Sequence, residues 1–154
     1  MSRQALIFRA RRHVCAVGLE QVVETMRPLP VRPLAGVPHY VRGVAVIRGA
    51  PTPVLSVRAL LDGDVPETAG PPTARFVTVD RGRQPYAFAV DEVLGIRTVP
   101  EPVWRDLPPL LRTVAAVTAF AAMEGEPTLF LDAARALPGE TWAALEPDPT
   151  PGDP

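Results

Sequence analysis

The chain has 154 residues, a formal net charge of −1 and 47% hydrophobic residues. This length suits one domain, or two small subdomains with a common core, and the hydrophobic content is sufficient to form that core. The near-neutral charge gives no electrostatic footprint for nucleic acid or for an acidic membrane surface. No apolar run reaches the length of a membrane span and no signal-peptide pattern begins the chain, so we expect a cytoplasmic protein without direct membrane insertion.

Several residue types that serve in catalysis are missing or rare. All 16 basic residues are arginine, because the sequence contains no lysine, and asparagine is absent as well. These absences exclude a phosphate-loop lysine, a Schiff-base lysine and a lysine general base. A single cysteine excludes an internal disulfide. We therefore expect a protein that is not an enzyme, with no cofactor and no metal.

The first part of the chain predicts a β-hairpin. Residues 5–9 and 14–19 are apolar runs, and the polar segment 10–13 separates them. After residues 20–26, the segment 27–38 carries four prolines and predicts an extended connection with little sheet.

Residues 41–61 carry the most distinctive pattern of the chain. A short apolar run, 44–47, lies between two glycines and is followed by Arg48. We expect two strands here, joined by a turn at the Pro-Thr-Pro segment 51–53. Arg48 is then expected at the rim between buried strands, where an arginine is costly unless it has a partner.

Capping residues predict two short helical turns. Ser56 is a plausible N-cap for a turn over residues 58–61, and Asp132 is one for a turn over residues 133–137.

The second part of the chain predicts four more strands, at residues 75–79, 86–90, 114–123 and 128–131. Residues 99–109 hold four prolines and predict an irregular crossing. We expect one domain over residues 1–138, with a break between its two subdomains near residues 62–73. The Pro-rich segment 139–154 is expected to be a mobile tail in which Trp142 is a loose anchor onto the body, with a partner contact as the alternative.

An internal repeat underlies this order of elements. An offset of 71 residues places residues 8–24 on residues 79–95, so that strand, arginine-rich turn and strand coincide. An offset of 76 places residues 49–56 on residues 125–132. Each half alone buries too small a face to be stable, so the two halves should share a core. The repeat predicts an all-β, duplicated fold.

The same residues carry a family likeness. The segment Gly-Val-Ala-Val-Ile-Arg-Gly at 43–49, followed by Pro-Val-Leu-Ser-Val-Arg at 53–58, resembles the glycine–strand–LRG and PVVDLR elements of the CheW-like domain. Residues 22–24, 90–93 and 131–137 match at the expected places, and the likeness spans about residues 5–137. This domain is the adaptor of bacterial chemosensory arrays and also the regulatory domain of the kinase CheA.

The resemblance implies two intertwined, five-stranded SH3-like β-barrel subdomains with a shared core. It implies a non-catalytic adaptor that couples chemoreceptor cytoplasmic tips to the regulatory domain of a CheA-type histidine kinase and is recruited to receptor arrays. Other CheW-like domains are possible further partners. The positions that match protein-binding positions of the family are Arg48, Glu24, Val22, Gly43 and Ile47. A structural salt bridge is the alternative role for Glu24 and Arg48.

Three departures from the family pattern affect binding more than fold. Ser56 replaces the usual aspartate, Val46 replaces a polar residue before the LRG element, and residues 115–123 lack the usual glycine. A chemosensory-like system other than flagellar chemotaxis is therefore an open alternative.

Other polar clusters favour structural roles. His13 and Cys15 could reach one metal ion from a strand, but we expect Cys15 to be a small core residue. Asp91 and Glu92 beside Asp80 could serve acid–base chemistry, but no histidine or serine completes such a site, so solvated strand ends are expected. The arginines at residues 11, 12, 81 and 83 are expected on hairpin turns.

Two other functions remain open from the sequence. One is a small-molecule-binding β module, or an enzyme built on it, with a ligand between the subdomains. The other is a detached regulator that competes with the kinase's own domain.

Overall fold

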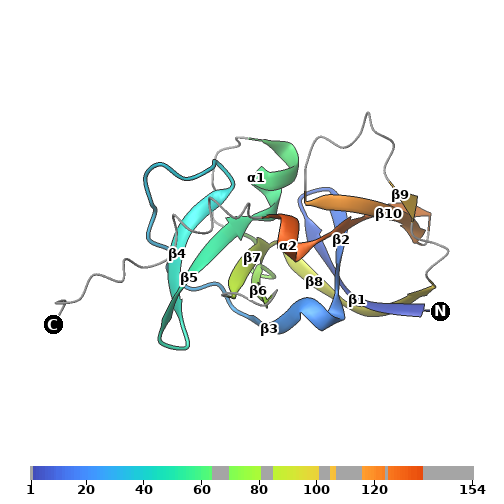
Figure 1. Ribbon diagram of the computed structural model, residues 1–154, viewed down its shortest axis with the longest axis horizontal. Helices are drawn as coiled ribbons and strands as arrows, with labels where there is room; N and C mark the ends of the chain where they lie inside the picture. The colour runs from blue at the N-terminus through green and yellow to red at the C-terminus, as the bar shows by residue number, and fades with distance from the viewer. Residues whose placement is uncertain are drawn as a thin grey trace, which may run out of the picture.

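Two β-sheets form the protein in the computed structural model, which describes residues 2–63, 70–80, 85–100, 105–106, 116–123 and 125–136 (Figure 1). Sheet A has the strand order β8-β1-β2-β11-β10-β9. Its strands are β1 (Ser2–Ala10), β2 (His13–Gly18), β8 (Glu92–Pro100), β9 (Arg105–Asp106), β10 (Val117–Met123) and β11 (Glu126–Leu131).

Sheet B has the order β3-β6-β7-β5-β4. Its strands are β3 (Val22–Met26), β4 (Val41–Ile47), β5 (Ala50–Ser56), β6 (Arg75–Val79) and β7 (Tyr86–Val90). The helical segments are a 3-10 helix, η1 (Leu19–Gln21), and two short α-helices, α1 (Val57–Asp62) and α2 (Ala133–Ala136). The predicted all-β fold with two subdomains and short helical turns is confirmed. Sheet A has one strand more than expected, because the two-residue β9 extends its edge.

The chain passes from sheet A to sheet B and back. Strands β1 and β2 belong to sheet A, β3 to β7 form sheet B, and β8 to β11 complete sheet A. β3 follows β2 in sequence but pairs with β6, whereas β8 follows β7 but pairs with β1. Each hairpin thus receives its edge strand from the segment that continues the other hairpin. The two subdomains are therefore intertwined, as predicted.

The strand registers confirm the internal repeat. Phe8 pairs with Val93 across β1 and β8, and Val22 pairs with Val79 across β3 and β6. An offset of 71 converts position 8 to 79 and position 22 to 93, so the two pairs are equivalent. Both pairings have a register irregularity beside the matched pair.

The parallel pairings obey the same relation. Leu131 of β11 lies beside Val17 of β2, and Leu55 of β5 lies beside Phe88 of β7. The offsets of 76 and 71 convert 55 to 131 and 17 to 88. Residues 62–73, where a break between the subdomains was predicted, lie between β5 and β6 of sheet B, and residues 64–69 are outside the described residues, so the break stays a prediction.

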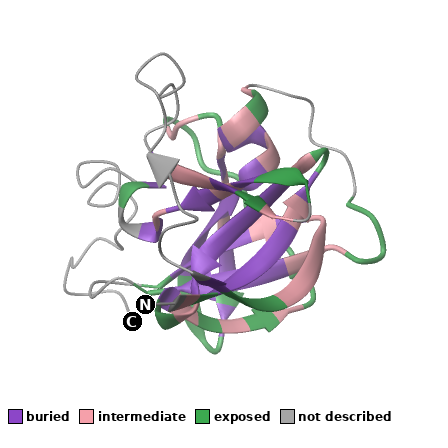
Figure 2. Ribbon diagram, turned by 90° about the vertical axis from the view of Figure 1, so that its right-hand side faces the viewer, coloured by how far each residue is buried: buried purple, intermediate pink, exposed green. Residues whose placement is uncertain are grey.

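The largest hydrophobic cluster draws side chains from both sheets. Phe8, Cys15 and Val17 of sheet A meet Leu55 and Phe88 of sheet B, and all five are 0% exposed. The rings of Phe8 and Phe88 stack with their centroids 6.4 Å apart. Smaller clusters lie within each sheet's own subdomain, and buried segments run through the strands in the centre of the molecule (Figure 2). The shared core predicted from the repeat is confirmed.

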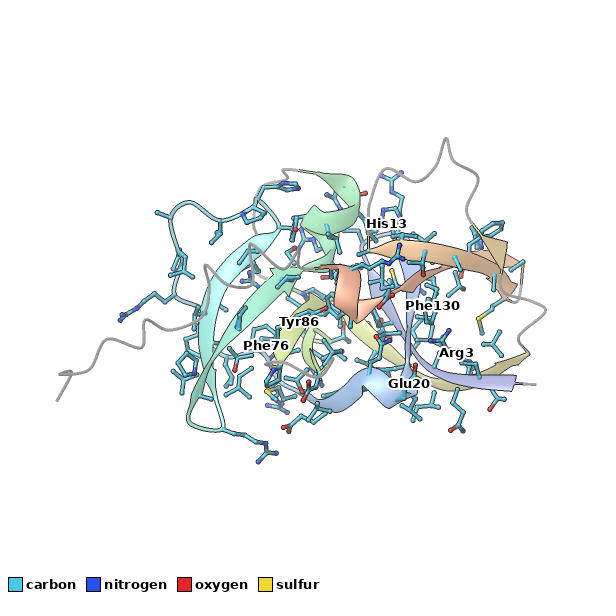
Figure 3. The ribbon with its side chains drawn as sticks, in the orientation of Figure 1. Arg3, His13, Glu20, Phe76, Tyr86 and Phe130 are labelled. Carbon is cyan, nitrogen blue, oxygen red and sulfur yellow. The ribbon has the colours of Figure 1, made fainter. Side chains whose placement is uncertain are left out.

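Buried polar contacts also join the subdomains. The hydroxyl of Tyr86, in sheet B, donates to the carbonyl of Ala133, which follows the last strand of sheet A. The N–H of Ala133 donates to Oε1 of the buried Gln21, at 3.1 Å (Figure 3 shows Tyr86 beside α2). Both backbone groups of Ala133 are thereby satisfied without water, as burial requires.

The predicted turn at residues 51–53 was wrong. The turn between β4 and β5 lies at Arg48-Gly49, where both residues have positive φ, of 50° and 79°. Pro51 and Pro53 lie inside β5, opposite Val46 and Val44 of β4. Strand β7 pairs with only residues 54–56 of β5, so within the described part of the chain no strand lies on the other side of the stretch that holds the prolines. Prolines are tolerated on such an edge because their missing N–H is not needed there.

Two other stretches depart from expectation. Residues 92–100 form β8, so the start of the predicted irregular crossing belongs to a strand. This strand was not recognised because three successive residues, 96–98, are exposed on both faces and break the alternation, and because it carries a positive-φ glycine, Gly95. Arg81, Arg83, the end of the second predicted helical turn, Trp142 and the tail lie outside the described residues.

Candidate functional site

Arg48 and Glu24 form a bidentate ion pair. The Nε and Nη2 atoms of Arg48 donate to the two carboxylate oxygens of Glu24 at 2.6 and 2.7 Å. Arg48 lies in the turn that follows β4, and Glu24 lies in β3. Because β3 and β4 are the two edges of sheet B, this pair links the edges of the sheet across its open side. The partner that an arginine at this position was expected to need is Glu24.

The two side chains differ in exposure. The side chain of Arg48 is 77% exposed, whereas that of Glu24 is 25% exposed. Arg48 is therefore in solvent at a turn and not at a rim between buried strands, which corrects the sequence expectation. The reason is the Arg48-Gly49 turn itself, whose left-handed backbone directs the arginine out of the sheet. The exposed fork is a charged, directional hydrogen-bonding group at the surface.

The pair shifts both ionisation equilibria. Hydrogen bonds from Arg48, helped by its charge, lower the pKa of Glu24 below its ordinary value, while partial burial opposes this effect. The hydrogen bonds and charge of Glu24 raise the pKa of Arg48. The pair is therefore fully charged at neutral pH.

The pair predicts a pH-dependent contribution to stability. Because the pKa of Glu24 is lowered on folding, its contribution should be present above the ordinary value of 4.5 and lost as the pH falls through the lower folded pKa. We expect Glu24→Gln to be less stable than the unmodified protein at pH 7 and equally stable in stronger acid. Urea denaturation at pH 7, 5 and 3 measures this difference. In an Arg48→Gln background the same substitution should show no such pH dependence, and an undiminished difference at pH 3 would contradict the prediction.

The other three predicted binding residues occupy different surroundings. Val22 is half-buried in β3, two residues before Glu24. Ile47 is 7% exposed and packs in the cluster within sheet B. Gly43 is buried, with φ of +143°, and its Cα lies against the carbonyl of Arg32. The structure thus places Glu24 and Arg48 together at the surface and gives Gly43 and Ile47 buried packing contacts.

One exposed apolar residue near this pair was noted in the sequence only as a departure. Val46, in β4 two residues before Arg48, is 67% exposed. Its exposure follows from the alternation along β4, in which Ala45 and Ile47 face inward.

His13 has a carboxylate partner. Its Nε2 lies 2.6 Å from Oδ1 of Asp62, at the end of α1, while Cys15 is 0% exposed (Figure 3 labels His13). Burial, with a smaller contribution from the charge of Asp62, raises the pKa of Cys15 to about 12, so the thiol is neutral and unreactive at physiological pH. In the described residues no three histidine, cysteine or acidic side chains gather as a metal site would require. Cys15 is a core residue, as expected.

Asp91 is not a solvated strand end. Its side chain is 17% exposed, and Oδ2 accepts a hydrogen bond from the backbone N–H of Arg11 at 2.6 Å. Its Oδ1 lies 4.0 Å from Nη1 of Arg58. The carboxylate therefore ties the β1–β2 turn to the junction of β7 and β8. This contact spans 80 residues of sequence, so local pattern gave no sign of it.

A cation over an aromatic ring is a further contact that the sequence did not reveal. The guanidinium carbon of Arg3 lies 4.2 Å from the ring centroid of Phe130, and Arg3 Nη2 lies 3.1 Å from Glu20 Oε1 (Figure 3). This contact fastens β1 to β11 and to the start of η1.

These observations define a class of protein. A duplicated β-domain carries an exposed bidentate ion pair between the two edges of one sheet. No helix in the described part of the chain is both long and apolar enough to span a bilayer. Such an arrangement is typical of a domain that presents a surface to other proteins.

The sequence model of the CheW-like domain matches residues 4–140, which is most of the chain. The chain therefore belongs to the CheW-like domain family. Among solved structures, it is similar to the scaffolding protein TtCheW from Thermoanaerobacter tengcongensis, with a TM-score of 0.75 and 17% sequence identity. That match covers 86% of this chain and 90% of the other, and it supports the fold with two SH3-like subdomains. No curated protein sequence matches the chain significantly.

Proposed function

We propose that this protein is a non-catalytic adaptor in a bacterial chemosensory array. The observation that carries the proposal is its membership of the CheW-like family over residues 4–140. The similar solved structure is described as a scaffolding protein, which agrees with this function. The adaptor couples the cytoplasmic tips of chemoreceptors to the regulatory domain of a CheA-type histidine kinase, and it acts in the cytoplasm at the array.

Arg48 and Glu24 form the centre of the proposed binding surface. The Arg48 fork is held by Glu24 through Nε and Nη2, so its orientation is set before a partner arrives. Preorganisation of this kind lowers the entropy lost on binding. Val22 adds apolar surface beside the pair, while Gly43 and Ile47 hold β4 in place behind it.

The proposal predicts a loss of binding without a loss of fold. Arg48→Ala should weaken binding to the kinase or receptor fragment by about 2 kcal/mol, which is roughly 30-fold in Kd, because an interface arginine loses its hydrogen bonds and charge. Pull-down and calorimetry with the host's own kinase and receptor cytoplasmic fragments measure this. Arg12→Ala, which removes an exposed arginine from the β1–β2 turn, is the matched control.

The outcomes separate the candidate functions. Binding to both fragments that is weakened by Arg48→Ala and not by Arg12→Ala supports the adaptor. Binding to the kinase alone favours a regulator that competes for it. Unchanged affinity in a folded Arg48→Ala protein would remove Arg48 from the interface.

A further inference from the structure

A shallow groove lies along the outer edge of β4. It is lined by residues of the connection between β3 and β4 and by two residues of β4 itself: Pro30, Val31, Arg32, Pro33, Val44 and Val46. All of these residues except Arg32 are apolar, and Val46 is 67% exposed. The groove therefore exposes apolar surface close to the Arg48 turn.

The backbone of Val46 faces the groove. The N–H and C=O of Val44 bond those of Arg32, at 2.9 and 2.8 Å, so they point away from β5. Backbone groups alternate in direction along an antiparallel strand, so those of Val46, two residues on, point the same way. In the register of the Arg32–Val44 bridge the residue opposite Val46 is Pro30, which has no N–H to donate. Within the described residues no backbone hydrogen bond joins Val46 to residues 30–33, so this part of the strand edge is open.

The surface around the groove is basic. Residues 25–61 contain five arginines and no acidic residue. Arg32 belongs to the lining, and Arg48 follows two residues after Val46. Arginines thus flank the apolar lining along β4, an arrangement that suits an apolar segment with carboxylates at its ends.

Residues 139–154 of this chain carry the opposite charge. Four of the 17 acidic residues and none of the 16 basic residues lie there, so this segment has a charge of −4. Residues 1–138 have a charge of 16 − 13 = +3. The segment and the rest of the chain therefore attract one another.

Residues 139–146 also match the groove in pattern. In an extended segment Glu140, Trp142, Ala144 and Glu146 point to one face, which places two apolar side chains between two carboxylates. These eight residues include no proline, so each has a backbone N–H that can pair with a strand edge.

The segment can reach the groove. α2 is bonded to β7 through the hydroxyl of Tyr86. In sheet B the strands β7, β5 and β4 are successive, so β4 lies roughly 10 Å from β7 at the usual strand spacing. Trp142 and Glu146 follow Ala136, the last residue of α2, by six and ten residues, which allows spans of up to about 20 and 35 Å.

From this match we infer that residues 139–146 dock on the β4 edge of the same chain. Trp142 lies against Val46 and the prolines of the groove, and the backbone of the segment pairs with that of Val46 as an added strand does. The two glutamates face Arg32 and Arg48.

Docking has a regulatory consequence that rests on the proposed function. The docked segment lies beside Arg48, which is the centre of the proposed binding surface. It therefore competes with the kinase or receptor for this side of the domain.

The test uses the full chain labelled with 5-fluorotryptophan. Its two tryptophans are Trp104 and Trp142, and Trp142→Phe assigns the fluorine signal of Trp142. The difference in this signal between H2O and D2O measures contact of the ring with solvent, and the chain in concentrated urea gives the fully exposed value. We expect a shielded ring whose signal does not change on dilution, because docking occurs within one molecule. A fully exposed ring, or shielding that is lost on dilution because segments exchange between copies, would overturn the inference.

Substitutions locate the docking. Val46→Asp should expose the ring of Trp142, whereas Ile96→Asp, at a 54% exposed position of the edge strand β8 in sheet A, should not. Arg32→Glu should lower the ratio of docked to free segment about fivefold or more, because an attraction becomes a repulsion. Arg97→Glu, also exposed in β8, is its matched control. An unchanged Trp142 signal in the Val46 and Arg32 variants, with folding checked by circular dichroism, would overturn the inference.

A charge exchange tests the ion pairing. Adding Glu140→Arg or Glu146→Arg to Arg32→Glu should restore the shielding in one of the two double variants, which identifies the glutamate that faces Arg32. Failure of both exchanges would contradict the assigned contacts.

The kinase and receptor fragments separate regulation from function. Trp142→Ala should bind a fragment about two- to tenfold more tightly, the gain expected when a docked fraction of about 50–90% is released. Unchanged affinity would refute the competition. If neither protein binds a fragment, the proposed function fails, and the fluorine signals still decide whether the segment docks. Shielding of Trp142 only after a fragment is added would assign the segment to the partner and overturn the inference.

Discussion

Phe88→Ala is expected to lower the free energy of unfolding by about 3–5 kcal/mol, the range for removal of a buried phenylalanine ring. Phe88 is 0% exposed and lies between the sheets, where its ring centroid is 6.4 Å from Phe8 and 5.3 Å from Tyr86. Truncation leaves a cavity that neither sheet can fill alone, because the backbone on both sides is fixed by strand pairing. Urea denaturation followed by circular dichroism measures the loss.

The position of Phe88 also predicts how the variant unfolds. Because the core is shared and the edge strands are exchanged, the two subdomains should unfold in one transition in both proteins. Phe120→Ala is the matched control, since Phe120 is only partly buried against the same core and should cost less. A loss under about 1 kcal/mol would contradict the predicted cost of the cavity, and two separate transitions would show that the subdomains are stable independently.

Gly43→Ala is expected to destabilise the protein by about 3 kcal/mol or more, from overpacking and backbone strain. A Cβ added at Gly43 would meet the carbonyl oxygen of Arg32 at 2.0 Å, and φ there is +143°. The same carbonyl accepts the N–H of Val44 at 2.9 Å, and the N–H of Arg32 donates to the carbonyl of Val44 at 2.8 Å. The added methyl group must therefore push the 30–34 segment off the edge of β4 and break both bonds.

Gly49→Ala separates the two causes. Gly49 also has positive φ, of +79°, but nothing lies within 4 Å of an added Cβ. This variant should lose only about 1 kcal/mol, the cost of a left-handed conformation for alanine. Thermal and urea denaturation of the two variants compare them directly. Equal losses would mean that backbone strain alone explains the requirement at Gly43.

The Gly43 result bears on the proposed binding surface. Gly43 matches a family position linked to protein contacts, yet it is buried against the Arg32 carbonyl. Loss of binding in a Gly43 variant would therefore be ambiguous, because β4 carries Val46 and leads into Arg48. Substitution of Arg48, whose side chain is 77% exposed, tests the surface without this difficulty.

Much of the fold was predictable because its signals are local. The repeat placed position 8 on 79 and position 22 on 93, and both pairs have equivalent registers in the structure. Ser56 was recognised as an N-cap, and its Oγ accepts the N–H of Ala59 at 3.2 Å. Strand alternation and helix capping depend on residues within a few positions of one another. The duplication is visible as a second copy of the same local pattern.

The misplaced turn shows where prediction from local sequence fails. Pro51 and Pro53 suggested a turn, but the strand edge that they occupy is unpaired on one side, and Arg48-Gly49 took the turn conformation instead. Whether a proline can lie in a strand depends on which strand stands beside it. Here β7, which lies more than 30 residues further along the chain, pairs with residues 54–56 of β5 and does not reach the two prolines.

The sequence by itself determined the all-β duplicated fold, the shared core and the family. Only the tertiary structure decided that Arg48 pairs with Glu24, that Asp91 anchors the β1–β2 turn, and that residues 30–33 line a groove with Val44 and Val46. The physical reason is the distance along the sequence over which each kind of interaction acts. Patterning and capping act between near neighbours, whereas ion pairs and grooves form between side chains that the fold brings together from separate parts of the chain.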